Sequence, residues 1–154
     1  MKFSDIKTVS NDLILGIISR NEFLKVQKNL PKKDLVLILV LEPGMEDISN
    51  EIVQDFKDVL QIKFWDVEES FCQYDPLTDS QGNELKEFIL KNKDSQFLIS
   101  CKAGKSRSAG VGLAIECLIN HSGDKYAHQT SYSSIKEHKG RYTPNLTVYD
   151  KILK

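Results

Sequence analysis

The chain has 154 residues and a formal net charge of -1, with 40% hydrophobic and 28% charged residues. This length suffices for one sizeable core and is too short for two, so we expect a single domain over residues 1–154. The balanced charge argues against a nucleic-acid partner. The sequence has no run of about 18 apolar residues and no signal-peptide pattern at its start, so we expect no stable membrane insertion. The sequence leaves the oligomeric state open.

The first third of the chain indicates strands and a helix. Residues 6–9 and 13–18 have the pattern of a short strand pair joined by a polar turn. Residues 21–30 are expected to form a helix that ends at a proline. Residues 35–41 are a continuous apolar run, which is typical of a strand covered on both faces.

The middle of the chain predicts a helix, a strand and a long polar loop. The helix is expected to begin at Ser49 or Asn50, and residues 61–64 are expected to return as a strand. A polar loop follows over residues 65–79. The residues expected on the apolar face of the helix are Ile52, Val53, Phe56, Val59 and Leu60.

The remaining elements continue this alternation. They are a helix that buries Leu85, Phe88 and Ile89, a strand at 96–100, and helices at 107–119, at 124–138 and after Pro144. Strands that alternate with helices across short connections predict an α/β fold with a largely parallel central sheet flanked by helices.

The most informative stretch begins where the strand at 96–100 ends. Cys101 and Arg107 stand on either side of a turn that contains Gly104, and an apolar helix follows directly. The free N–H groups and the positive dipole end of a helix start bind anions, and a guanidinium binds phosphate through two N–H groups. The same positive field favours a nucleophilic thiolate. The stretch therefore predicts a phosphate site with a nucleophile at its base.

Charge and composition support this prediction. Only three of the 21 basic residues are arginine, and Arg107 is one of them. No acidic residue lies between Asp94 and Glu116, whereas Lys102, Lys105 and Arg107 lie within six positions. A planar guanidinium is the group that two-pronged phosphate recognition requires.

The sequence Cys-Lys-Ala-Gly-Lys-Ser-Arg-Ser at 101–108 resembles the signature loop of the cysteine-dependent protein tyrosine phosphatases, and is most similar to the dual-specificity branch. Leu15-Gly16 in an early strand, an Asp thirty-odd residues before the cysteine, and Pro144-Asn145 before the last helix also match that family. The resemblance implies a phosphatase-type fold with the cysteine loop between a central strand and a helix. Ser100 stands where the family usually has His.

The chemistry and the resemblance together assign the candidate site residues. Cys101 is the candidate nucleophile, and the resemblance implies that Ser108 donates a hydrogen bond to its thiolate. The candidate phosphate-binding residues are Lys102, Ala103, Gly104, Lys105, Ser106 and Arg107.

A general acid must also protonate the leaving oxygen. Asp66 is our candidate because it follows an apolar strand and its position resembles that of the family's general acid. Four other carboxylates of the same loop compete for this role: Glu68, Glu69, Asp75 and Asp79.

The other cysteines and the histidines carry little further signal. Cys117 is expected in the core, and Cys72 is interpreted as a half-buried small residue, with a resolving thiol for oxidised Cys101 as the competing interpretation. The three histidines form no metal-ligand spacing, so we expect neither a metal nor a cofactor. Three irregularly spaced cysteines, one of them a working thiol, favour the reducing cytoplasm.

These observations predict a phosphomonoester hydrolase that acts through a cysteinyl-phosphate intermediate. The resemblance implies that its substrate is a phosphorylated protein, with phosphotyrosine favoured, or another phosphomonoester. Lys102 and Lys105 leave open a phosphoinositide or other polyanion phosphatase, because paired lysines in this loop also resemble those of the phosphatases related to tensin. The sequence also leaves open a rhodanese-like sulfur-transfer enzyme and a catalytically inactive phosphate-binding module.

Overall fold

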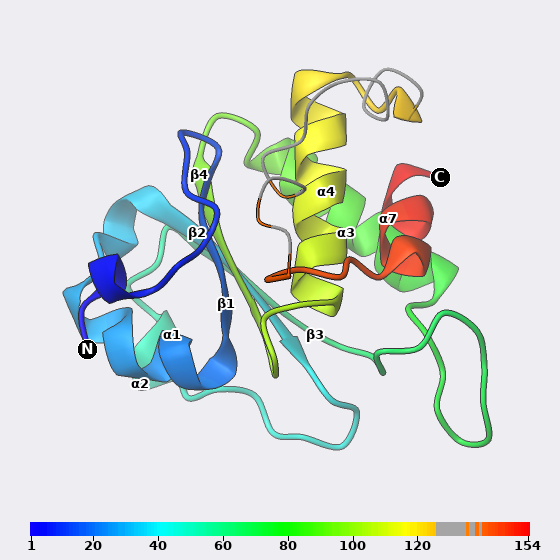
Figure 1. Cartoon of the computed structure of the whole chain (residues 1–154), viewed down its shortest axis with the longest axis horizontal. Coiled ribbons are helices and arrows are strands. Elements are labelled where there is room, and N and C mark those ends of the chain that lie inside the picture. The colour runs from blue at the N-terminus through cyan, green and yellow to red at the C-terminus, as the bar shows by residue number, and fades with distance from the viewer. Residues whose placement is uncertain (126–134, 136–137, 139) are drawn as a thin grey trace.

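The computed structural model describes residues 1–125, 135, 138 and 140–154 (Figure 1). In this part of the chain the backbone forms a four-stranded sheet in which every strand pairs in parallel with its neighbours. The strand order is β1-β4-β2-β3. The strands are β1 (Ile14–Ser19), β2 (Leu35–Leu41), β3 (Asp58–Lys63) and β4 (Gln96–Cys101).

Helices cover both faces of this sheet, with α1 and α2 on one side and α3, α4 and α7 on the other (Figure 1). The predicted α/β fold with a parallel sheet flanked by helices is thereby confirmed. The α-helices are α1 (Arg20–Val26), α2 (Asn50–Val53), α3 (Asp79–Lys91), α4 (Arg107–Asn120) and α7 (Leu146–Leu153). Short 3-10 turns lie at Phe3–Asp5, Gln27–Asn29 and Lys32–Asp34.

The apolar run of β2 is buried on both faces, as predicted. Its alternate side chains enter two different cores, since Ile38 belongs to the core under α3, α4 and α7 and Leu37 belongs to the core under α1 and α2. Neighbouring β4 alternates in the same way, with Ile99 in the first core and Leu98 in the second. These two central strands hold the cysteine at the end of β4 in a rigid setting.

The predicted strand at residues 6–9 is wrong. Its polar groups are satisfied by side chains rather than by a ladder: Thr8 Oγ1 accepts from Ile17 N at 2.8 Å, and Tyr142 Oη accepts from Val9 N at 3.2 Å. Because Tyr142 also donates to Ile17 O at 2.9 Å, a residue from the far end of the chain replaces the strand pairing beside β1.

The predicted helix through Leu60 is also too long. Helix α2 ends at Val53, and Val59 and Leu60 belong to β3, which begins at Asp58. Six consecutive residues of β3 pair with β2. The tertiary ladder therefore overrides the helical periodicity. The helix predicted at 124–138 lies mostly outside the described residues.

Backbone packing places the start of α7 against α4. A Cβ atom added to Gly110 would lie 2.5 Å from the carbonyl oxygen of Asn145, so only glycine permits this approach. Asn145 caps α7, since its Oδ1 accepts from Thr147 N at 3.0 Å and from Val148 N at 3.2 Å. Among the described residues, no helix has the length and apolar character that crossing a bilayer requires.

Candidate active site

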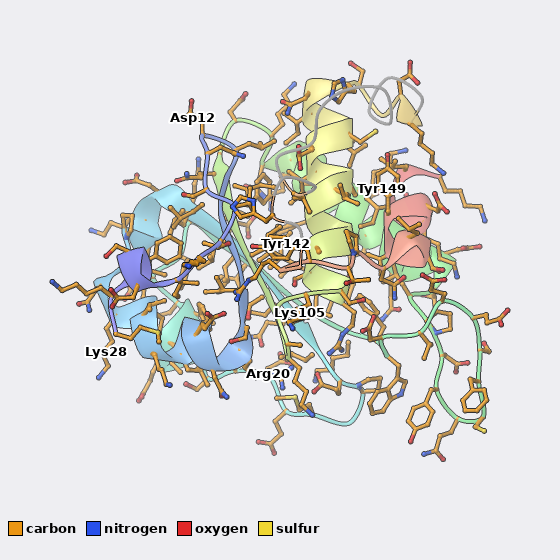
Figure 2. All side chains as sticks on the ribbon, in the orientation of Figure 1. Asp12, Arg20, Lys28, Lys105, Tyr142 and Tyr149 are labelled. Carbon is orange, nitrogen blue, oxygen red and sulfur yellow. The ribbon has the colours of Figure 1, made fainter. Side chains whose placement is uncertain are left out.

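The carboxyl ends of the four parallel strands meet at one edge of the sheet, where ligands bind in folds of this kind. Arg20 follows β1, Glu42 follows β2, Phe64 follows β3, and the Cys101 loop (residues 101–107) begins at the end of β4. Figure 2 shows Arg20 and Lys105 at this same end of the molecule. Residues that are far apart in the sequence thus form one site.

Backbone carbonyl groups of the Cys101 loop accept hydrogen bonds from the surrounding protein. Arg20 N donates to Lys102 O at 3.4 Å, Thr143 N to Lys105 O at 2.9 Å, and Asn145 N to Ser106 O at 3.0 Å. In the described part of the chain, the backbone N–H groups of residues 102–106 donate no hydrogen bond. A run of unused donors beside a helix start is a binding site for an anion.

Gly104 permits the loop to lie against the end of β1. Its φ is +68°, which is the left-handed region that glycine adopts without strain. A Cβ atom there would also approach Ile18 C to 2.5 Å, so a side chain has no space. The loop therefore depends on this glycine for both its conformation and its contact.

The nucleophile candidate lies at the base of a small pocket. Cys101 is only 2% exposed, and its Sγ lies 3.0 Å from Ser108 Oγ in the first turn of α4. This contact fits the predicted hydrogen bond between the two side chains. The pocket has a volume of about 280 Å³ and is lined by Glu42, Trp65, Asp66, Cys101, Lys102, Ala103, Ser106 and Arg107.

Arg107 is buried and is held by two acceptors. Its Nη1 donates to Phe64 O at 2.9 Å and to Glu42 Oε2 at 3.4 Å. Among the described residues, Nε and Nη2 donate no hydrogen bond, so this edge of the guanidinium remains for a ligand. These two contacts orient the guanidinium through Nη1 and leave its other N–H donors available.

Glu42 is a site residue that the sequence analysis missed, and Arg20 holds it in place. Arg20 Nη2 donates to Glu42 Oε2 at 2.7 Å, and Nη1 donates to Oε1 at 3.2 Å. The hydrogen bonds from Arg20 lower the pKa of the Glu42 carboxyl below its usual value, against the opposing effect of partial burial, and the charge of Arg107 adds to the lowering. The available signal was position, since both residues directly follow strands of the sheet.

Asp66 is the one acid of its loop that lines this pocket. Its Oδ1 accepts from Ser106 Oγ at 2.7 Å and from Asn145 Nδ2 at 3.0 Å. These bonds leave Oδ2 without a donor among the described residues. Ser106, predicted as a phosphate-binding residue, thus orients the acid, and the sequence analysis did not assign Asn145 this role.

The competing acids of the same loop do not line the pocket. Asp75 accepts from Ser70 Oγ at 3.0 Å, and Asp79 pairs with Lys154 at 3.3 Å. Glu68 and Glu69 are exposed.

The remaining predicted residues take different positions. Lys102 and Lys105 are exposed, whereas the hydroxyl of Ser100 is buried and has no hydrogen-bond partner among the described residues. Cys72 is exposed rather than half-buried, and Cys117 lies in the core as expected. Within the described residues, no group of three or more His, Cys, Asp or Glu side chains is arranged to hold a metal ion.

Several solved structures have a fold similar to that of this chain. The structure of PTPMT1 in complex with PI(5)P matches 96% of this chain and 91% of that one at 17% identity, with a TM-score of 0.60. Tk-PTP in its active form matches 96% of this chain and 95% of that one at 16% identity, with a TM-score of 0.58. The human tyrosine phosphatase-like serine/threonine/tyrosine-interacting protein matches 96% of this chain and 86% of that one at 16% identity, with a TM-score of 0.53.

No protein-family model and no curated protein matches this sequence. The structural matches nevertheless extend over nearly the whole chain. The chain has the fold of the cysteine-dependent protein tyrosine phosphatases, which include the dual-specificity phosphatases.

Proposed function

We propose that this protein is a phosphomonoester hydrolase that acts through a cysteinyl-phosphate intermediate. The observation that carries this proposal is the Cys101 loop, in which a thiol lies at the base of a pocket beside a run of unused N–H donors and the free edge of Arg107. This arrangement binds a phosphoryl group by its non-bridging oxygens and brings phosphorus to the sulfur.

In the first step, the Cys101 thiolate attacks phosphorus and the ester P–O bond breaks. Asp66 transfers its proton to the leaving oxygen, and Ser106 and Asn145 hold it in position for this transfer. Arg107 and the backbone N–H groups stabilise the charge on the transferring group.

In the second step, water attacks the phosphocysteine. The Asp66 carboxylate takes a proton from that water, the S–P bond breaks, and inorganic phosphate leaves. The sulfur departs as a thiolate, which the Ser108 hydroxyl stabilises at 3.0 Å. The cycle requires Cys101 in its reduced form, so we propose the cytoplasm as the compartment.

Hydrolysis of para-nitrophenyl phosphate tests this proposal. Cys101→Ser is expected to abolish turnover and to retain phosphate binding, whereas Cys72→Ser, which removes an exposed thiol, is the control and is expected to retain turnover. Rapid acid quenching during turnover should trap a phosphoryl group on the peptide that contains Cys101. Phosphate binding without turnover by the wild type would instead establish an inactive phosphate-binding module.

A second candidate function is hydrolysis of a phosphoinositide or another polyanion. The observation in its favour is that Lys102 and Lys105 are exposed on the Cys101 loop and, among the described residues, pair with no carboxylate. Their replacement by alanine is expected to impair hydrolysis of a multiply phosphorylated inositol lipid far more than that of a phosphotyrosyl peptide if this function is correct.

A further inference from the structure

The loop between β3 and α3 presents an exposed hairpin. Phe71 N donates to Tyr74 O and Tyr74 N donates to Phe71 O, both at 2.9 Å, and Cys72 has a φ of +55° between them. Ser70 Oγ also donates to Asp75 Oδ1 at 3.0 Å, closing the hairpin at its base. This turn leaves Phe71 67% exposed. Tyr74 at the other end of the turn is 36% exposed, so the hairpin presents two aromatic side chains to solvent.

The base of this hairpin (residues 70–75) is attached to the wall of the pocket. Trp65 lines the pocket, and its ring meets that of Tyr74 edge to face at 4.9 Å between centroids. Trp65 N also donates to Asp75 O at 3.2 Å. On the other side, Thr147 Oγ1 donates to Glu68 O at 2.9 Å. The hairpin and the residues before it therefore have a defined position beside the phosphate site.

The two sides of the pocket opening carry opposite charge. Asp66, Glu68 and Glu69 lie on the loop at one side of the pocket, whereas Lys102, Lys105 and Arg107 belong to the Cys101 loop at the other side. Glu68 and Glu69 are exposed, and among the described residues neither side chain has a hydrogen-bond or ion-pair partner. Unpaired carboxylates beside a phosphate pocket attract a cationic group on the substrate and repel an anionic one.

We propose that the hairpin and the two glutamates before it bind the polypeptide that flanks the phosphorylated residue, and that the substrate is a phosphoprotein segment with basic and apolar side chains there. Glu68 and Glu69 receive the basic side chain, and Phe71 with Tyr74 receives the apolar one. This inference rests on the proposed function and commits to its substrate class. An anionic lipid surface has the wrong charge for this side of the opening.

An extended peptide reaches these residues from the pocket. Because such a chain advances about 3.3 Å per residue, side chains a few positions from the phosphorylated residue lie over the loop that follows Asp66. A small aryl phosphate extends no further than the pocket itself, so it reports on the chemistry without contacting the hairpin.

The test compares phosphotyrosyl peptides of one length whose flanking positions are Lys and Leu, Glu and Leu, or Lys and Ser. We expect wild-type kcat/KM to be at least about fivefold higher for the Lys-Leu peptide than for the Glu-Leu peptide at low salt, and this ratio to fall in high salt. The double variant E68K/E69K is expected to reverse the preference. Phe71→Ala is expected to remove the advantage of Leu over Ser.

The matched control for charge is E84K/E87K, which makes the same change on exposed positions of α3, away from the pocket. It is expected to retain the wild-type preference. Phe71→Ala and E84K/E87K are expected to hydrolyse para-nitrophenyl phosphate at the wild-type rate. E68K/E69K is expected to hydrolyse it at least as fast as the wild type, because the change removes negative charge beside the pocket for a dianion. These rates show that the chemistry is intact.

Equal kcat/KM for the Lys-Leu and Glu-Leu peptides would overturn the inference while leaving the proposed function standing. Faster hydrolysis of a phosphoinositide in anionic vesicles than of any peptide would also overturn it, in favour of a lipid substrate. If para-nitrophenyl phosphate is not hydrolysed, the proposed function fails, and the affinities of the same peptides for the wild-type chain then decide the inference. Equal affinities for the Lys-Leu and Glu-Leu peptides would contradict the inference.

Discussion

Arg20 binds the carboxylate of Glu42 at the binding edge of the sheet, with 2.7 Å between Nη2 and Oε2. Glu42 in turn lies 3.4 Å from Arg107 and lines the pocket that we assign to phosphate. A carboxylate in such a pocket repels a phosphate dianion unless it is neutralised. Two guanidinium groups beside one carboxylate leave a net positive charge at the site. Arg107 lines the pocket, whereas Arg20 neutralises Glu42 from outside the pocket lining.

Arg20→Ala is therefore expected to raise the Ki of inorganic phosphate as a competitive inhibitor by about tenfold, which corresponds to about 1.4 kcal/mol. Adding Glu42→Gln in the same chain should recover part of this loss, because the uncompensated charge is then removed. The matched control is Arg141→Ala, which breaks a similarly buried ion pair with Glu22 at 2.8 Å outside the pocket lining. An unchanged Ki in Arg20→Ala would show that Arg20 has no part in anion binding.

The same ion pair predicts a dependence of stability on pH. Since Arg20 holds the pKa of Glu42 below the usual 4.5, the unfolded state binds this proton more readily than the folded state. The contribution is therefore fully present above about pH 4.5 and is lost as pH falls through the lowered folded pKa. Urea unfolding across this range should show a shallower acid loss in Glu42→Gln than in the wild type. A residual slope is expected from Glu22 and Asp58, whose pKa values are also lowered.

Asp66→Asn is expected to slow hydrolysis of phosphotyrosine by about 100-fold or more and to affect an activated aryl phosphate much less, because only a poor leaving group requires a proton in the transition state. The measurement is kcat/KM over a series of aryl phosphates with different leaving-group acidity. Asp75→Asn, on the same loop but outside the pocket lining, is the control. If Asp75→Asn rather than Asp66→Asn produced the leaving-group dependence, the assignment of the acid would be wrong.

Gly104→Ala is expected to destabilise the chain and to abolish phosphate binding. The substitution imposes a left-handed conformation on alanine, at about 1–2 kcal/mol, and also places Cβ against the backbone of Ile18. Gly123→Ala separates these causes, since Gly123 has a φ of +80° but its nearest neighbour is at 3.7 Å. Urea unfolding should show the larger loss for Gly104→Ala, and equal losses would mean that the contact with β1 is unimportant.

Ser100→Ala is expected to leave stability unchanged or to raise it by up to about 1 kcal/mol, because within the described part of the chain the buried hydroxyl has no partner whose bond would be lost. Ser108→Ala provides the comparison, since Ser108 is equally buried but has its hydroxyl 3.0 Å from Cys101 Sγ. The two free energies of unfolding are measured side by side. A loss of more than about 1 kcal/mol in Ser100→Ala would reveal a hydrogen bond that Ser100 makes in solution.

The part of the site that is contiguous in sequence was predictable. Cys101 and Arg107 lie six positions apart across a strand end, a glycine turn and a helix start, and these local signals suffice to predict an anion loop. The burial of β2 was predictable for a similar reason, because seven consecutive apolar residues have one stable environment.

Only the tertiary structure decided which side chains surround that loop. Asn145 donates a hydrogen bond to Asp66, which is 79 positions earlier in the sequence, and Arg107 donates one to Glu42, which is 65 positions earlier. Parallel strands bring their carboxyl ends together, but the strand order and register that make these contacts cannot be inferred from local patterns in a single sequence. The same limit explains residues 6–9 and 59–60, where a distant tyrosine hydroxyl and a ladder with β2 overrode the local pattern. Residues close together in the sequence therefore suffice to predict the phosphate loop. The orientation of Arg107 and of Asp66 depends on hydrogen bonds to residues that are distant in the sequence.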